Sequence, residues 1–351
     1  MNELQQILLS EAPLWITLSG YRQLMVAAFS SCKPATTAST PTPSAPVLAA
    51  SAASAQPLTP VLAASAASAQ PPTVTSFFFP EEKTYKEKCS EALAQLKIKQ
   101  QSEGREVTLT DDFSSPELPE RSIAYHRIFG PITAHSHWYF STLQFERDII
   151  DAEQNPNISA HVLHINSPGG EAWYLDRLGE TLDACQKPIV AIYEQACSAA
   201  YHIACHAQLL YATTQFDFVG CIGTMTSFYD FEPYYAAMGI KLVEAKATQS
   251  DLKNKMFDDL RGGKPQQFIE QVLNPMNADF LQCVRTHRPK LASLPDDAPV
   301  LRGETFYTAA AIEQGLADGL RTFEQAIAET AELANKYAND KFVQDLVYSA
   351  V

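Results

Sequence analysis

The chain has 351 residues, of which 46% are hydrophobic and 19% charged, as is ordinary for a soluble globular protein with one large domain or two modest ones. Its formal net charge of −14 and the lack of a basic stripe with interleaved aromatic residues argue against nucleic acid as a partner. Seven scattered cysteines include no C-x-x-C pair, so we expect neither a disulfide framework nor a zinc knuckle, and a reducing cytoplasm fits best.

The first third of the chain predicts little packed structure. No run reaches the ~18 apolar residues of a membrane span. The nearest, 15–32, is interrupted by Arg22 and Gln23 and lacks the basic start of a secretory signal, so we expect no export. We expect a short helical segment over 1–32, then a disordered linker over 33–75, which is rich in Ala, Ser and Pro and repeats "PVLAASAASAQP". A helical stem is expected over 76–118.

From residue 119 the pattern alternates between strands and helices, and a tail follows over 336–351. In chain order, strands are expected at 122–132, 160–167 and 188–194, and helices at 143–154 and 171–185, the second with Leu175, Leu178, Leu182 and Cys185 on one face. Strands separated by helices of this length predict an α/β domain with a mostly parallel sheet over 119–335.

Two small-residue motifs follow the expected strands, "NSPGG" at 166–170 and "ACSAA" at 196–200. Ligands of parallel sheets collect at this edge. We expect "SPGG" to turn from strand to helix, with the backbone N–H groups of Gly169 and Gly170 facing a ligand as an oxyanion hole. Ser198, at the start of the next helix among alanines, suits a nucleophile. The ordinary alternatives are a helix cap and a simple turn.

A serine nucleophile needs a base. His202 and His206 share the helix that Ser198 begins, and their side chains point away from its start. Their i, i+4 spacing is that of a zinc-binding helix, but no third ligand is evident, so we favour core or surface histidines and predict no metal. Residues 239–255, "GIKLVEAKATQSDLKNK", predict a strand over 241–247 and then a lysine-rich loop. A lysine can act as the base only if burial lowers its pKa; otherwise these are surface lysines.

The motifs resemble, in order and spacing, those of the signal peptide peptidase A family, whose phage members act as capsid or prohead maturation proteases. They are "HINSPGG", "PIVAIYEQACSAAYHIA", "VGCIGTM" (219–225), "GIKLVEAKA" and "LRGETFYTAAAIEQGLADGL" (301–320). The resemblance covers roughly 120–325. It implies a Clp protease/crotonase-like spiral of ββα units and a Ser/Lys dyad that hydrolyses peptide bonds without metal, nucleotide or other cofactor.

The resemblance implies that Ser198 is the nucleophile, that Gly169 and Gly170 are its oxyanion donors, and that a lysine is the base. An ungapped match places Asp251 at the lysine position, so we expect Lys253, with Lys255 as the alternative. Three residues, Ala199, Ala200 and Cys221, depart from the family pattern. Alanines follow Ser198 where the family has glycines, and Cys221 stands where a serine orients the lysine.

The sequence therefore predicts a serine endopeptidase that processes phage capsid or scaffold protein in the host cytoplasm or the prohead. The expected partners are a protein substrate and further copies of the chain in a homo-oligomeric ring, without a membrane span. Two alternatives remain open. One is a soluble host peptidase that degrades signal peptides or misfolded proteins, and the other is a catalytically silent ring scaffold of crotonase shape.

Overall fold

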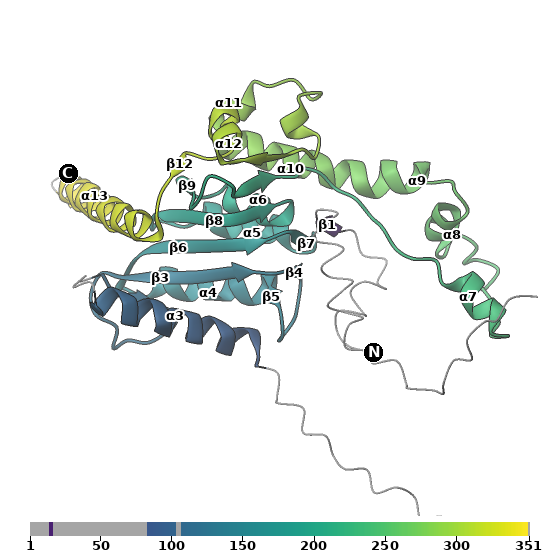
Figure 1. The fold of residues 1–351 in the computed structure, drawn as a ribbon, viewed down its shortest axis with the longest axis horizontal. Coiled ribbons are helices and arrows are strands. Elements are labelled where there is room, and N and C mark those ends of the chain that lie inside the picture. Colours follow the sequence, from purple (N-terminus) through teal and green to yellow (C-terminus); the bar gives the residue numbers. More distant parts are fainter. Residues whose placement is uncertain (1–13, 17–82, 103–106, 350–351) are drawn as a thin grey trace, which may run out of the picture. The chain divides into compact units, whose positions relative to one another are not determined.

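The computed structural model describes residues 14–16, 83–102 and 107–349 (Figure 1). The expected linker over 33–75 lies outside these residues. Of the expected helical segment over 1–32, only Leu14–Ile16 are described, and they form a strand, β1, rather than a helix.

The predicted mostly parallel sheet is confirmed. Within the described residues, six of its strands follow the order β11-β10-β8-β6-β3-β2, and β9 pairs with β8 and β12. All neighbours are parallel except β11, which is antiparallel to β10. The strands are β2 (Leu109–Thr110), β3 (Ser122–Phe129), β6 (Ile158–Ser167), β8 (Ile189–Cys197), β9 (Leu209–Ala212), β10 (Phe218–Gly220), β11 (Thr305–Tyr307) and β12 (Gly319–Leu320).

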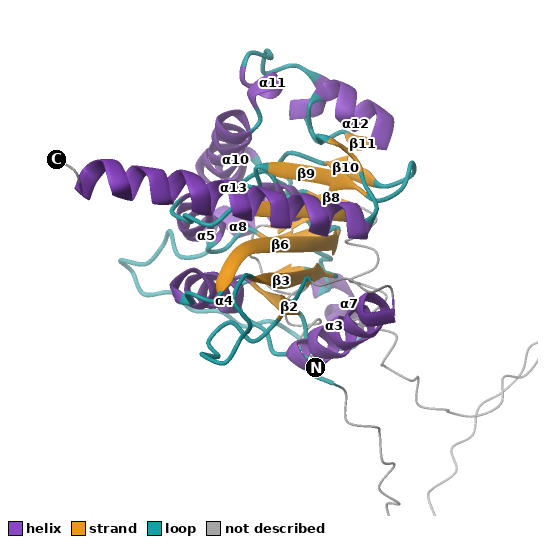
Figure 2. Ribbon diagram, turned by 90° about the vertical axis from the view of Figure 1, so that its left-hand side faces the viewer, coloured by secondary structure: helices purple, strands orange, loops and turns teal. Residues whose placement is uncertain are grey.

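Helices cover both faces of this sheet, as Figure 2 shows. They are α3 (Tyr85–Ser102), α4 (Thr142–Gln154), α5 (Leu175–Asp183), α6 (Ala199–Ala204), α7 (Glu232–Ala237), α8 (Lys255–Arg261), α9 (Gln266–Phe268), α10 (Asn274–His287), α11 (Pro289–Ala292), α12 (Thr308–Gln314) and α13 (Phe323–Ser349). A π-helical turn, η1 (Ile269–Leu273), joins α9 to α10, and a 3-10 turn, η2 (Pro299–Leu301), precedes β11.

The central strand β6 shows why both faces must be covered. Leu163 and Ile165 pack into a core that includes α4, α5, α6 and α10. Ala160 and Val162 point the other way, into a core shared with α3 and α13. A strand that is apolar on both sides is typical of a parallel sheet between two helical layers. The expected helix face of Leu175, Leu178 and Leu182 is confirmed as the buried side of α5.

The expected stem helix packs against the sheet. Leu93 of α3 is buried with Ile123 of β3 and Ile327 of α13. Helix α13 begins within the expected peptidase domain and continues unbroken past residue 335, where we expected the tail to begin. Among the described residues, no helix is both long and apolar enough to cross a membrane.

A second, smaller sheet has the order β1-β7-β4-β5. Its further strands are β4 (Ile132–Thr133), β5 (Phe140–Ser141) and β7 (Gly169–Glu171). We expected "SPGG" to lead directly into a helix, and this is wrong, because Gly169–Glu171 pair with β4 and β1 and the helix begins only at Leu175. This sheet brings Gly169 and Gly170 to the edge of the fold where β8 ends.

Candidate functional site

Ser198 occupies a strained turn between β8 and α6. Its backbone angles are φ 55° and ψ −121°, a region that residues with a side chain rarely adopt. The turn is held from both sides. The Ser198 N–H donates to the Gly220 carbonyl at 2.9 Å, and the Ser198 carbonyl accepts from the N–H of Tyr201 at 2.8 Å. Such conformations cost about 1–3 kcal/mol and cluster at functional sites.

The side chain of Ser198 makes no capping hydrogen bond to α6, although Ser198 stands at the N-cap position. A capping serine accepts from the second or third N–H of its helix and so contributes to stability. Capping therefore does not explain this serine. The residue is 1% exposed, and its neighbours Ala196, Ala199 and Ala200 are buried.

Cys221 directly follows β10, the strand that pairs with the end of β8 before Ser198. In the parallel pairing of β8 with β10, Gly220 is opposite Cys197, so the following residues Ser198 and Cys221 leave the sheet together. Cys221 also has a positive φ, 53°, and its N–H donates to the Glu304 carbonyl at 2.8 Å. Burial raises the pKa of its thiol to about 11, so the group is a neutral, weak hydrogen-bond donor at neutral pH.

Both candidate oxyanion glycines are required by the backbone. Gly169 has φ 99°, a conformation that favours glycine, and its N–H donates to Ser167 Oγ at 3.2 Å. A side chain on Gly170 would place its Cβ 1.9 Å from the Ile132 carbonyl oxygen. Strand β7 lies against α6, the helix that Ser198 starts. The structure thus brings the glycine strand and the serine turn together, as the sequence predicts.

Strand β7 is paired along one edge by β1 from far up the chain. The two run antiparallel, with Trp15 opposite Gly170 and Ile16 opposite Gly169. An extended segment therefore lies beside the candidate oxyanion glycines, in a backbone arrangement like that of peptides that add a strand to a sheet edge.

The predicted strand over 241–247 is wrong. The chain is irregular there, and Leu242 and Val243 are 56% and 83% exposed. A strand requires a neighbour for its N–H and C=O groups, and within the described residues none pairs with this segment. The lysine loop therefore does not extend from a sheet strand.

The candidate lysines lie around α8. Lys253 is exposed in the turn before this helix, and Lys255 begins the helix and forms an ion pair with Asp259. Lys246 donates to Asp258 Oδ2 at 3.0 Å. No hydrogen bond within the described part of the chain joins Ser198 to Lys253 or Lys255. Figure 1 shows α8 well apart from α6.

Three of the histidines before Ser198, at positions 126, 161 and 164, have structural contacts, whereas His135 and His137 are exposed. His161 Nε2 lies 3.0 Å from Glu153 Oε1, and its Nδ1 lies 3.1 Å from His126 Nε2. Burial lowers the pKa of both imidazoles, which stay neutral at neutral pH. His164 bridges Tyr125 and Glu194. These contacts indicate structural roles rather than a histidine base.

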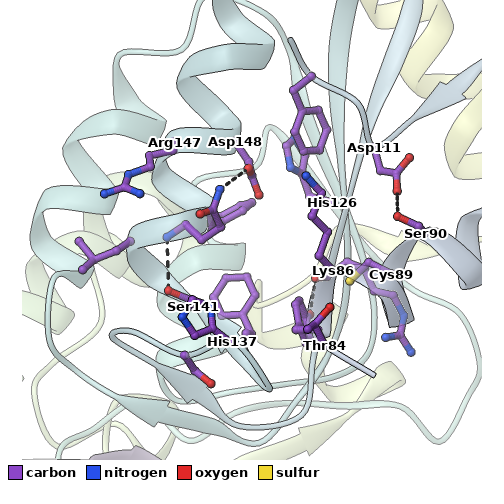
Figure 3. Close-up of a pocket in the computed structure, with 18 of the residues that line it drawn as sticks. Thr84, Lys86, Cys89, Ser90, Asp111, His126, His137, Ser141, Arg147 and Asp148 are labelled. Atoms are coloured by element: carbon purple, nitrogen blue, oxygen red, sulfur yellow. Dashed lines mark hydrogen bonds between the residues drawn. The ribbon is translucent and has the colours of Figure 1, made fainter. Parts of the chain in front are cut away.

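A separate pocket is lined by α3, β3 and α4 (Figure 3). It contains none of the candidate catalytic residues. Asp148 points into it and accepts from Gln144 Nε2 at 2.9 Å, and burial raises the pKa of this carboxyl to about 6. Ser90 donates to Asp111 at 2.6 Å at the other side of the pocket.

Parts of this chain are similar in sequence to known proteins. The model of peptidase family S49 matches residues 181–336, a little under half of the chain, and includes Ser198, Cys221 and the lysine loop. A protein of Methanocaldococcus jannaschii that carries the name of a protease is 25% identical over 53% of this chain and 59% of its own length. Protease 4 of Haemophilus influenzae is 27% identical over 55% of this chain and 31% of its own length.

Residues 181–336 are thus similar to peptidase family S49, and the two relatives carry the names of proteases. The chain spans less than two thirds of either relative. Among solved structures, the membrane-bound stomatin-specific protease 1510-N gives a TM-score of 0.36 at 12% identity, over 61% of this chain and 81% of that one. An enoyl-CoA hydratase/isomerase family member gives 0.31 at 17% identity, over 60% and 73%.

Proposed function

We propose that the chain is a serine endopeptidase and that Ser198 is its nucleophile. The observation that carries this proposal is the conformation of Ser198, a strained, buried turn whose hydroxyl does not cap the helix that follows. Strain of this kind persists only where the surrounding structure holds it, and it is common at nucleophiles. The family match adds independent support.

In this mechanism the Ser198 hydroxyl attacks the substrate carbonyl, and backbone N–H groups at Gly169 and Gly170 stabilise the negative charge that develops on its oxygen. The substrate lies extended along β7, as β1 does in the structure. The N–H of Gly169 already donates to Ser167 Oγ. Its long distance of 3.2 Å allows this bond to be given up or shared when an oxyanion forms.

The decisive experiment is labelling with a fluorophosphonate probe, together with a peptidase assay. Ser198→Ala abolishes both labelling and hydrolysis if the proposal is right. Ser293→Ala, at an exposed serine that ends α11, is the matched control and keeps both. Labelling that survives in Ser198→Ala would identify another nucleophile.

We propose a Ser/Lys dyad with Lys253 as the general base and Lys255 as the alternative. The sequence resemblance supports it, and among the described residues no histidine forms a hydrogen bond to the Ser198 hydroxyl. Lys255 already forms an ion pair with Asp259, so its ammonium group has a partner other than Ser198. Lys253→Met abolishes hydrolysis and Lys255→Met does not. The reverse result would reassign the base.

We further propose that a second copy of the chain completes the site, in a homo-oligomeric ring. The lysines belong to an arm, defined here as residues 225–268, which carries α7, α8 and α9. Large apolar side chains on this arm are exposed, among them Tyr234 at 61%, Val243 at 83% and Leu252 at 71%. Exposed apolar surface of this extent marks an interaction site. An arm packed on a neighbouring copy buries these side chains and supplies the lysine.

Mixing two inactive variants tests this directly. If the base comes from a neighbour, Ser198→Ala and Lys253→Met chains that are refolded together regain activity at about a quarter of the sites, because each working site needs one intact residue from each variant. A dyad within one chain gives no recovery. Size-exclusion chromatography of the wild-type protein provides the oligomeric state independently.

The substrate we propose is phage capsid or scaffold protein, processed in the prohead or the host cytoplasm. Support for this step comes from the sequence resemblance alone. The test has two parts: whether a capsid gene lies beside this gene, and whether wild type but not Ser198→Ala cleaves the capsid protein. The absence of such a gene, or a capsid protein that stays intact, would contradict this step. A catalytically silent ring scaffold is the second candidate, favoured by Cys221 in place of a hydroxyl and by the distance of the arm from α6. Failure of the fluorophosphonate to label any serine would favour it.

A further inference from the structure

Four potential metal ligands converge where α6 ends. Cys205 and His206 follow α6 directly, while Cys283 and His287 lie one turn apart at the end of α10. Cys205 Sγ lies 3.6 Å from Cys283 Sγ, and Cys283 Sγ lies 3.3 Å from His206 Nε2 and 3.8 Å from His287 Nδ1. All four ligand atoms lie within 4.8 Å of one another.

These separations fit the edges of a tetrahedral zinc site. Zinc lies about 2.3 Å from sulfur and about 2.0–2.1 Å from nitrogen, so a regular tetrahedron has edges of about 3.8 Å between two sulfurs and about 3.5 Å between sulfur and nitrogen. Three of the six ligand distances, 3.6, 3.3 and 3.8 Å, differ from these edges by at most a few tenths of an ångström, and the others are no longer than 4.8 Å. A metal ion could therefore enter with little movement of the chain.

Asp183, the last residue of α5, orients both imidazoles. Its Oδ1 lies 2.7 Å from His206 Nδ1 and 2.7 Å from His287 Nε2. A carboxylate there accepts an N–H from each ring, so the other nitrogens, His206 Nε2 and His287 Nδ1, face the sulfurs and can bind a metal ion once they carry no proton. Zinc-binding histidines usually have such a partner. His287 Nδ1 also lies 2.8 Å from the Cys283 carbonyl oxygen, a contact that metal binding replaces.

The position of the cluster suits a structural ion. Cys205 is fully buried and His206 is 9% exposed, while Cys283 and His287 are half-buried, so an ion has a route in from the surface. Helices α5 and α10 both pack against α6.

We propose that Cys205, His206, Cys283 and His287 bind Zn²⁺ in a closed structural site. Two thiolates and two imidazoles are the donor set of structural zinc, and four protein ligands leave no open position for a substrate. The ion ties α10 to the end of α6, whose other end carries Ser198. The site thereby fixes a helix of only six residues that follows a strained turn. This proposal does not depend on peptidase activity.

This inference departs from our prediction of no metal. The sequence places the histidine pair of "HIACH" on one helix, but α6 ends at Ala204, before His206. His206 joins Cys205 and two residues from a helix about 80 positions downstream. The signal that was missed is the i, i+4 spacing of Cys283 and His287, which lie on α10.

The test is the metal content of the full chain, expressed without a histidine tag and measured by elemental analysis. We expect one zinc ion per chain, retained through dialysis. Replacement with Co²⁺ should give the visible absorption of a tetrahedral site with thiolate ligands. Cys283→Ser and His287→Gln lose the ion, whereas Cys89→Ser, at a half-buried cysteine on α3, keeps it. Asp183→Asn keeps all four ligands and should weaken zinc affinity 10–100-fold in competition with a chelator.

A second measurement covers the case in which a variant fails to fold. In the wild-type protein, a thiol-alkylating reagent should modify Cys205 and Cys283 only after zinc is removed by a chelator, and the melting temperature should fall on removal. Wild-type protein that holds no zinc overturns the proposal. This applies equally if its thiols are free and if its intact mass is lower by two hydrogens, as a Cys205–Cys283 disulfide would make it. Zinc that remains in both ligand variants overturns it equally.

Discussion

The strain at Ser198 predicts an unusual order of stability among its variants. At φ 55° and ψ −121° a side chain costs about 1–3 kcal/mol, and glycine avoids most of this cost. Glycine also gives the unfolded chain more freedom, which destabilises the fold by about 0.4–1 kcal/mol relative to alanine. Ser198→Gly should therefore be more stable than Ser198→Ala by about 0.5–2 kcal/mol, although both variants are inactive.

The matched control is Ser293, which has ordinary angles of φ −94° and ψ −1°. There, glycine should be less stable than alanine by about 0.4–1 kcal/mol, so the two sites are expected to give opposite signs. Urea or thermal unfolding measures both pairs, and 1 kcal/mol corresponds to a shift of about 2–4 °C in the melting temperature of a domain of this size. If glycine is also the less stable residue at position 198, the turn is not strained and the argument for a held nucleophile loses its basis.

Three further predictions concern the glycine strand β7, the separate pocket that contains Asp148, and β1. Gly170→Ala should prevent the pairing of β7 with β4, lower the stability clearly and abolish activity, because the added Cβ would lie 1.9 Å from the Ile132 carbonyl oxygen. A normal melting temperature and normal activity would show that this edge of the sheet adapts. Asp148→Asn should stabilise the protein by about 1–3 kcal/mol at pH 7 but hardly at pH 4. Burial raises the pKa of Asp148 from 3.8 to about 6, so the free-energy cost of ionising this carboxyl in the folded protein grows between these pH values. Equal effects of the substitution at pH 4 and pH 7 would contradict this. Deletion of residues 1–31 should lower KM for peptides by removing β1 from the edge of β7, and an unchanged KM would mean that β1 does not compete with substrate.

The core of the fold could be predicted from the sequence because each segment carries its own signal. Apolar runs such as 188–194 predicted buried strands, and the leucines of α5 predicted its buried face, since both patterns follow from local periodicity. The turn at Ser198 was also predictable, because small residues that follow a strand in a parallel sheet mark the edge where ligands bind.

Errors arose where structure depends on a partner distant in the sequence. Gly169–Glu171 form a strand only because β4 and β1 lie beside them, and neither neighbour is evident from the local pattern, so a helix start was predicted instead. The cluster of Cys205 and Cys283 was missed for the same reason. Local patterns predict elements, but they do not show which elements meet.

The segment 241–247 also shows that a strand depends on a pairing partner, because here the local pattern predicts a strand that does not form. Its alternation of apolar and charged residues is typical of a strand, yet within the described residues it finds no pairing partner and leaves Val243 83% exposed. Under the proposed ring, a second copy of the chain would bury this apolar face, and the adjoining lysines belong to the same arm. Sheet order within one chain is enough to bring the proposed nucleophile and glycines together. The proposed base would come from a neighbouring copy, and the mixing experiment with Ser198→Ala and Lys253→Met tests that directly.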